Sequence, residues 1–259
     1  PSEGFRARAK DVVENPFLRQ SFRGAMDFLI NKRIAQFPSA EELETLRTLG
    51  EQIRQYNLGK LPSLLVQLEE SLTRNGIQVH WAETPDEANA IILGICQAHS
   101  AKLMVKGKSM VSEEIELNHA CAAVGIEAME SDMGEYIVQL AGEKPSHIIM
   151  PAIHKTKEEI ARLFHEKVEG VDYTDNVDEL IQIGRKVLRE KFLVADIGLS
   201  GVNFAVAETG TLCLVENEGN GRLSTTAPPV HIAITGIEKI VPTLEDFATC
   251  ADWELAGGY

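Results

Sequence analysis

Apolar residues recur every three to four positions after several polar cap residues, and this pattern predicts helices along much of the chain. In four cases a glutamate follows the cap by three positions, which is the spacing of a capping box. These four caps are Ser39, Thr84, Thr156 and Asn176. A fifth helix is predicted from Ser109 to Val124, with Gly125 ending it.

Short apolar runs between the predicted helices have strand character. These runs are Ile77–Ala82, Lys102–Lys106, Ile126–Glu130, His147–Met150 and Phe192–Val194. Strands that alternate with helices form a parallel sheet. Residues 202–216 and 230–241 instead predict consecutive strands joined by turns, with no helix between them. We therefore expect an α/β fold: an open, mostly parallel sheet with helices on both faces, and a hairpin or small added sheet.

The alternating pattern also predicts how the chain is divided. Residues 1–70 are mostly helical and precede the α/β part, so we expect them to form an N-terminal helical extension. Residues 71–248 are expected to form the α/β domain, because no repeat and no low-complexity linker interrupts them. One compact domain with a helical extension is the predicted architecture.

Charge and composition narrow the class of protein. The 259 residues carry a formal net charge of −14, which disfavours nonspecific nucleic-acid binding because such binding depends on Lys and Arg. No apolar run approaches the ~20 residues of a membrane helix, and the first residues lack a signal-peptide core. We therefore expect a cytoplasmic protein without a membrane span.

The cysteines are far apart in the sequence and form no C-x-x-C pair. They are Cys96, Cys121, Cys213 and Cys250. Iron–sulfur and structural zinc sites usually draw on closely spaced ligands. We therefore expect no metal and no cofactor to be held by this chain.

Residues 195–223 contain the densest group of candidate site residues. Two apolar runs flank a polar turn, in which Glu208 is followed by Thr209, Gly210 and Thr211. A carboxylate in such a turn could act as a base, a nucleophile or a ligand anchor. The alternative is a turn residue between two strands. We take Glu208 as a candidate catalytic residue and the three residues after it as candidate ligand contacts.

Asn220, Gly221 and Arg222 form a second polar group in the same stretch. Arginine presents a planar fork of donors that suits a carboxylate or a phosphate, so Asn220 and Arg222 are candidate ligand contacts. Asn-Gly is also a strong hairpin signal. The two interpretations are compatible.

Lys106, Gly107, Lys108 and Ser109 join a predicted strand to a predicted helix. Exposed N–H groups at a helix start favour an anion, and the two lysines add charge, so Lys106, Lys108 and Ser109 are candidate anion contacts. The spacing is not that of a P-loop. The alternative is a solvated turn with a capping serine.

His154 ends a predicted strand just before the Thr156 cap. It is either a surface histidine or a catalytic group that moves a proton near neutral pH. The carboxyl ends of parallel strands meet at one edge of a sheet. We therefore expect Lys106–Ser109, His154 and Glu208–Arg222 to converge on a common rim.

Four motifs resemble the lactate utilization protein B family and its N-terminal LUD domain. The motifs are GKSMVSEE (107–114), PSHIIMPAIHK (145–155), AETGTL (207–212) and ENEGNGRLSTTAPPVHI (216–232). The resemblance runs in order from about residue 20 to about residue 247. It implies a fold similar to the ribose-5-phosphate isomerase and CoA-transferase group. It also implies a bacterial complex that oxidises L-lactate to pyruvate and passes electrons onward.

The resemblance further implies a C-terminal ferredoxin-like segment that holds two 4Fe–4S clusters. The sequence ends at Tyr259 without such a motif, and residues 249–259 differ from the usual continuation as an atypical tail. Electron transfer through clusters is therefore not expected within these 259 residues.

Three functions remain open. The chain could be a subunit of a lactate-oxidising complex that binds a small anionic ligand, with sister subunits as partners. It could be a transferase or isomerase acting on a CoA ester or a sugar phosphate, a fold-level analogy. It could also be a non-catalytic assembly module, with a homo-oligomer as an open alternative. No flavin or nicotinamide fingerprint is visible, so direct dehydrogenation by this chain alone is not expected.

Overall fold

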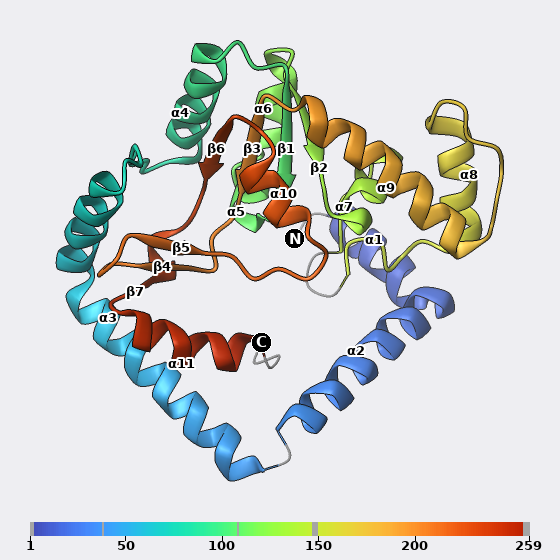
Figure 1. Ribbon diagram of the computed structural model, residues 1–259. Coiled ribbons are helices and arrows are strands. Elements are labelled where there is room, and N and C mark those ends of the chain that lie inside the picture. Colours follow the sequence, from blue (N-terminus) through green and yellow to red (C-terminus); the bar gives the residue numbers. More distant parts are fainter. Residues whose placement is uncertain (1–2, 38, 108, 147–149, 256–259) are drawn as a thin grey trace. The chain divides into compact units, whose positions relative to one another are not determined.

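The computed structural model describes residues 3–37, 39–107, 109–146 and 150–255 (Figure 1). The chain groups into two compact units. Unit 1 comprises Pro1–Pro38 and Met133–Arg185, and unit 2 comprises Ser39–Asp132 and Lys186–Tyr259. Each unit is described by itself.

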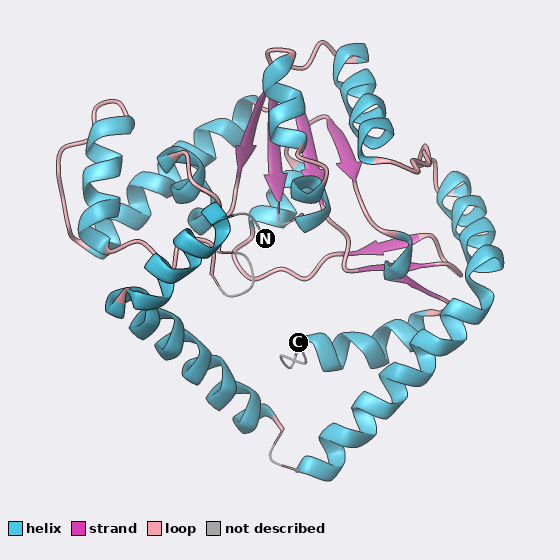
Figure 2. Cartoon of the chain, turned by 180° about the vertical axis from the view of Figure 1, so that it is seen from behind, coloured by secondary structure: helices cyan, strands magenta, loops and turns pink. Residues whose placement is uncertain are grey.

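Unit 2 is built on a four-stranded sheet, called sheet A, in the order β2-β1-β3-β6. Its strands are β1 (Leu103–Gly107), β2 (Glu127–Glu130), β3 (Ile197–Ser200) and β6 (Val230–Ala233). Figure 2 shows the four arrows running in the same direction, and all three strand pairs are parallel. The strand ends at Gly107, Glu130, Ser200 and Ala233 therefore share one edge, which we call the carboxyl edge.

Helices on one face of sheet A close the main core. They are α4 (Pro85–Ala98), α5 (Met110–Glu114) and α6 (Leu117–Ala123). Apolar side chains of β1, β3, α4 and α6 form one buried cluster that includes Met104, Ile197 and Leu199. Side chains along a strand alternate between faces, so Lys106 points to the same face as Met104. The Lys106 side chain accordingly meets Asn118 of α6.

The opposite face of sheet A carries α10 (Asn220–Thr226), which packs on three strands. Glycine makes this packing possible. A Cβ at Gly198 would lie 1.7 Å from the Ser224 carbonyl oxygen, and a Cβ at Gly107 would lie 3.2 Å from the Gly221 Cα. The helix backbone thus rests directly on the strands. Helices cover both faces of a parallel sheet, and the predicted α/β fold is confirmed.

A second, three-stranded sheet, sheet B, has the order β5-β4-β7. Its strands are β4 (Phe204–Val206), β5 (Thr211–Cys213) and β7 (Ile240–Val241), the last preceded by a 3-10 turn at Ile237–Lys239. β4 pairs antiparallel with β5 and parallel with β7. The long helix α3 (Ala40–Arg74) buries leucines on one face of this sheet, and α11 (Leu244–Leu255) packs on the other. The predicted strands on both sides of Glu208 are therefore present.

Unit 1 is helical in the residues that the structure describes. It contains α1 (Glu3–Glu14), α2 (Pro16–Gln36), α7 (Met133–Ala141), α8 (Lys157–Lys167) and the start of α9 (Val177–Val194). Thr156 and Glu159 complete the predicted capping box of α8. The rings of Tyr136 and Phe164 lie 6.1 Å apart and join α7 to α8.

Two predicted strands are wrong. Residues 77–82 have no regular secondary structure and pair with no described strand, and Ile77 and Trp81 are exposed. Residues 192–194 form the last turn of α9 instead. Leu180, Leu188 and Phe192 are all buried at multiples of four residues, so the helical period continues through the apolar run that resembled a strand.

The prediction that no helix separates residues 202–216 from 230–241 is also wrong. Asn220 begins α10 rather than a hairpin turn. The single helix predicted from Ser109 to Val124 is divided into α5 and α6, because Glu116 adopts a left-handed backbone with φ of 53°. The strand predicted at His147–Met150 falls largely on 147–149, outside the described residues.

Candidate functional site

The carboxyl edge of sheet A begins with a buried ion pair. The Lys106 ammonium donates to the Glu130 carboxylate at 2.6 Å, and their side chains are 2% and 8% exposed. Asn118 bridges both groups: its Oδ1 accepts from Lys106 Nζ at 2.9 Å, and its Nδ2 donates to Glu130 Oε1 at 2.9 Å. The charge of Lys106 is therefore neutralised by Glu130, on the face of sheet A that α6 covers.

Serine hydroxyls extend the polar edge toward α10. Ser131 follows β2, and its hydroxyl donates to the Lys106 carbonyl and lies 3.3 Å from the Ser224 hydroxyl. Ser131 and Ser224 are buried, and so is Ser200 at the end of β3. A row of buried hydroxyls therefore crosses the ends of neighbouring strands. Ligands of open α/β sheets bind at such edges.

Ser109 is buried and caps the short helix α5. Its hydroxyl accepts from the Ser112 N–H at 3.1 Å, and its carbonyl accepts from the Ser112 hydroxyl at 2.8 Å. Ser109 is therefore the capping residue of α5, as the alternative interpretation of the sequence expects. Lys108, its predicted companion, lies outside the described residues.

The carboxylate of Glu216, in the loop before α10, accepts the backbone N–H groups at the start of this helix. Glu216 Oε1 accepts from the N–H groups of Asn217, Glu218 and Gly219, and Oε2 accepts from the Arg222 N–H at 2.8 Å. Burial raises the pKa of Glu216, but the N–H groups outweigh burial and bring the pKa below 4.5. The Arg222 side chain is exposed, while its backbone is held by Glu216.

We expect Glu216→Gln to lose about 1–2 kcal/mol of unfolding free energy at pH 7, because the amide offers one acceptor in place of two charged ones. The native carboxylate has a lowered pKa. Its stabilisation is therefore present above the unfolded-state pKa and is lost as the pH falls through the folded-state value. Urea unfolding from pH 7 to pH 3 should show the difference shrinking as the pH falls through the lowered pKa of Glu216. Glu114→Gln, at an exposed helix end, is the control; a gap that is as large at pH 3 as at pH 7 would contradict the expectation.

Asn220 differs from the groups around it. It is the first residue of α10, it is 6% exposed, and neither its Oδ1 nor its Nδ2 has a hydrogen-bond partner in the structure. A buried polar group without a partner costs about 1–3 kcal/mol. Such a group in a native fold calls for an explanation, and an absent ligand is one of the usual ones.

The Glu208 turn is fixed by α3 rather than by the carboxyl edge. Asn75 Nδ2 donates to the carbonyls of Thr209 and Gly210 at 2.9 and 3.3 Å. Gly210 has a φ of 65°, and a Cβ there would lie 2.6 Å from the Ser71 backbone. Glu208 itself is exposed, and its Oε2 accepts from the Leu244 N–H at 3.4 Å, at the start of α11. The hydroxyls of Thr209 and Thr211 lie 2.8 Å apart.

His154 belongs to unit 1, where it contacts two polar groups. Its Nε2 lies 2.8 Å from Glu143 Oε2, and its Nδ1 lies 3.3 Å from the Ser146 hydroxyl. Glu143 also binds Lys155. The hydrogen bond from Lys155 is the main cause that lowers the pKa of Glu143, with His154 contributing less. The Glu143 carboxylate and the Ser146 hydroxyl together fix the orientation of the His154 ring.

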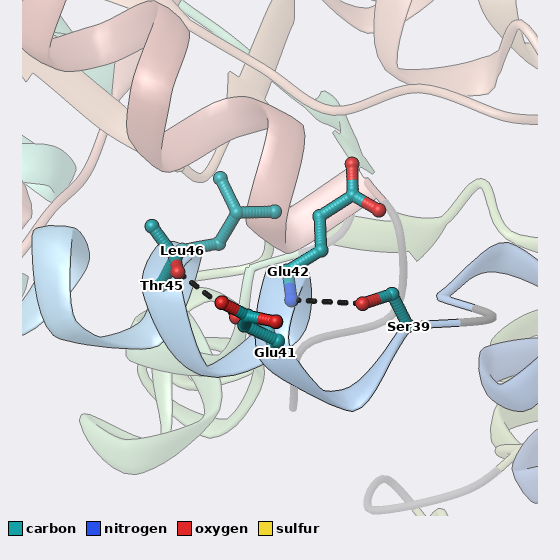
Figure 3. Close-up of a pocket in the computed structure, with 5 residues that line it drawn as sticks. All are labelled: Ser39, Glu41, Glu42, Thr45 and Leu46. Carbon is teal, nitrogen blue, oxygen red and sulfur yellow. Dashed lines mark hydrogen bonds between the residues drawn. The ribbon is translucent and has the colours of Figure 1, made fainter.

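A shallow pocket lies at the start of α3 and is shown in Figure 3. Its lining comprises Ser39, Glu41, Glu42, Thr45 and Leu46. The Ser39 hydroxyl accepts from the Glu42 N–H, and the Thr45 hydroxyl donates to the Glu41 carbonyl, so both hydroxyls serve the helix. Two exposed glutamates make this pocket unsuitable for an anion.

Within unit 2, the predicted residues fall into two groups. Lys106, Ser109 and Asn220 belong to the carboxyl edge of sheet A, with Lys106 and α10 on opposite faces. Glu208–Thr211 belong to the turn between β4 and β5 and are held by α3. His154 is in unit 1.

Sequence reasoning missed Glu130, Glu216 and the Ser131–Ser224 contact. Glu130 ends a predicted strand, and Lys106 ends the predicted strand before it. Opposite charges at the ends of two such strands indicate a possible ion pair between them. Glu216 precedes a Gly- and Asn-rich segment, where an acidic residue can satisfy backbone N–H groups. No sequence pattern indicates which serines meet across the edge.

The class of protein follows from comparison with known families. The profile of the LUD domain family matches residues 65–257, which include both sheets and the carboxyl edge. The chain belongs to the LUD domain family.

The chain is also similar to curated proteins. It is 44% identical to lactate utilization protein B of Bacillus pumilus (strain SAFR-032) over 246 residues, covering 95% of this chain and 52% of that protein. It is 44% identical to lactate utilization protein B of Bacillus cereus (strain B4264) over 242 residues, covering 93% of this chain and 51% of that protein. The chain thus spans about half the length of these relatives. No solved structure matches it.

Two further findings concern cofactors and membranes. Among the described residues, no group of three or more His, Cys, Asp or Glu side chains is arranged to hold a metal ion. None of the helices described is both long and apolar enough to cross a bilayer.

Proposed function

We propose that this chain is the LUD-domain portion of a lactate utilization protein and binds a small carboxylate, L-lactate or pyruvate, at the carboxyl edge of sheet A. The observation that carries the proposal is the family match over residues 65–257, together with 44% identity to lactate utilization protein B. In such a protein, the oxidation of L-lactate to pyruvate would pass electrons to other parts of the assembly.

The polar edge supports the ligand part of the proposal. Buried hydroxyls of Ser131, Ser200 and Ser224 line the strand ends, and Asn220 adds an unpaired amide. The serine hydroxyls are hydrogen-bonded to each other, to the Lys106 carbonyl or to His231, so the Asn220 amide is the group here that carries the cost of burial without a partner. The edge also lies inside the segment that the family profile covers.

Helix α2 supports the partner part of the proposal. None of its described side chains is buried, and Phe28 and Ile34 are 52% and 59% exposed. The helix also carries four basic residues and one acidic residue in a chain of net charge −14. The basic residues are Arg19, Arg23, Lys32 and Arg33. An apolar and basic helix suits an acidic surface on a sister subunit.

We expect L-lactate or pyruvate to raise the unfolding free energy by about 2.7 kcal/mol at a hundred times its dissociation constant. Thermal unfolding over a concentration series measures this effect, with propionate as the control of equal size that lacks the second oxygen function. Stabilisation by neither acid would overturn the proposal. Stabilisation by a CoA ester or a sugar phosphate alone would favour transferase or isomerase chemistry instead.

A further inference from the structure

Asn220 is a buried residue at the carboxyl edge, and neither of its side-chain hydrogen-bonding groups is used within the described structure. Its side-chain oxygen and nitrogen have no partner in the structure, although the residue is only 6% exposed. Asn57 offers a contrast in the same unit. It is 7% exposed, but its Nδ2 donates to the Ile240 carbonyl at 2.9 Å, so only its oxygen is unpaired.

The position of Asn220 is fixed closely by its neighbours. Gly221, the next residue, lies against Gly107 at the end of β1, and a Cβ on Gly221 would lie 2.4 Å from Glu216 Oε2. One turn later, Ser224 contacts Ser131 at the end of β2. Asn220 therefore follows directly on a loop and precedes a helix backbone that is packed against the strand ends.

The groups around Asn220 limit what it can recognise. Glu216 already satisfies the N–H groups of Gly219 and Arg222, so the start of α10 has no free backbone donors at these positions for a phosphate. The negative charge of Glu216 also disfavours a multiply charged ligand. A free amide offers one acceptor and donors side by side, which matches a ligand that presents a donor next to an acceptor.

A 2-hydroxy acid has this arrangement, because its hydroxyl donates while its carboxylate accepts. A 2-oxo acid has acceptors only, so its keto oxygen would face the amide oxygen without a hydrogen between them. We propose that Asn220 is a specificity-determining residue that selects 2-hydroxy acids over 2-oxo acids, with Oδ1 accepting from the hydroxyl and Nδ2 donating to the carboxylate. This inference rests on the proposed function, since it concerns the same edge and the same ligands.

Titration calorimetry with L-lactate and pyruvate tests this inference on the full chain. The native protein should bind L-lactate at least about tenfold more tightly than pyruvate, the ratio that one net hydrogen bond provides. Asn220→Leu, and Asn220→Ala if leucine does not fold, should bring the two affinities to within about twofold of each other. Asn57→Leu is the matched control and should leave the ratio as in the native protein.

A second readout needs no ligand. Asn220→Leu should be at least as resistant to urea as the native protein, because no hydrogen bond is lost, whereas Asn57→Leu should be less resistant. An unchanged lactate-to-pyruvate ratio in the Asn220 variants would overturn the inference while leaving the proposed function in place. Equal loss of stability in the Asn220→Leu and Asn57→Leu variants would overturn it as well. Binding of neither acid by the native protein would remove both proposals.

Discussion

Glu130→Leu should lower the unfolding free energy by about 3–5 kcal/mol, the usual cost of leaving one member of a buried ion pair without its partner. The Lys106 ammonium is 2.6 Å from the Glu130 carboxylate, and the side chains are 2% and 8% exposed. Without Glu130, the ammonium loses its ion pair and keeps its hydrogen bond to Asn118 Oδ1. Equilibrium unfolding in urea, followed by circular dichroism, measures the loss.

The double variant Lys106→Met with Glu130→Leu tests whether the loss comes from the unpaired charge. It should recover most of the stability, because two apolar side chains of similar volume replace a pair that was expensive to desolvate. Glu127→Leu is the control at the other end of β2. Glu127 binds Lys191 at 2.6 Å but is 51% exposed, so its loss should cost at most about 1 kcal/mol. Equal effects of the two single variants would contradict the role of burial.

The sequence predicts the sheet because the relevant signals are local. Capping residues such as Thr156 and the apolar run at Lys102–Lys106 fix helix starts and strand positions without reference to distant residues. The prediction of a strand at 192–194 is wrong because this segment is too short to carry a local signal. Three apolar residues have no period of their own, and the spacing of Leu180, Leu188 and Phe192 by eight and four residues assigns them to a helix.

Helix α10 could not be predicted from local signals. Asn220-Gly221 favours a hairpin in isolation. In the fold, the Glu216 carboxylate accepts four backbone N–H groups before and at the start of the helix, and Gly221 fits beneath this carboxylate. Tertiary packing against β1 and β3 then selects the helix over the turn.

The candidate site is predictable in position but not in partners. The expected common rim includes Lys106, Ser109 and Asn220, which belong to the carboxyl edge, but also Glu208–Thr211, which are held by α3 instead. Which of these groups is free depends on contacts between distant segments. Lys106 is paired by Glu130, Ser109 caps α5, and Asn220 is left with an unpaired amide.

Gly198→Ala should be the other severe substitution, with a loss of at least about 3 kcal/mol or failure to fold, because overpacking against backbone cannot be relieved by rotating a side chain. Its Cβ would lie 1.7 Å from the Ser224 carbonyl oxygen and 2.8 Å from the Ser224 carbonyl carbon. Since α10 rests on β3 at this point, the helix would have to lift away, and Asn220 would move with it. Urea unfolding and the yield of folded protein measure the effect.

Alanine substitutions at two other glycines show whether the loss at Gly198 comes from close packing or from introducing alanine as such. Gly107→Ala should cost less than Gly198→Ala, because its nearest atoms are 3.1 and 3.2 Å away and the Ser224 hydroxyl can rotate. Gly94→Ala, in the exposed part of α4 with nothing within 4 Å, should stabilise the protein by roughly 0.5–1 kcal/mol. If Gly198→Ala unfolds at the same urea concentration as the native protein, α10 does not rest on β3 as described. With Gly94 as the reference, the effects at Gly198 and Gly107 therefore measure how closely α10, which begins at Asn220, is held against the sheet.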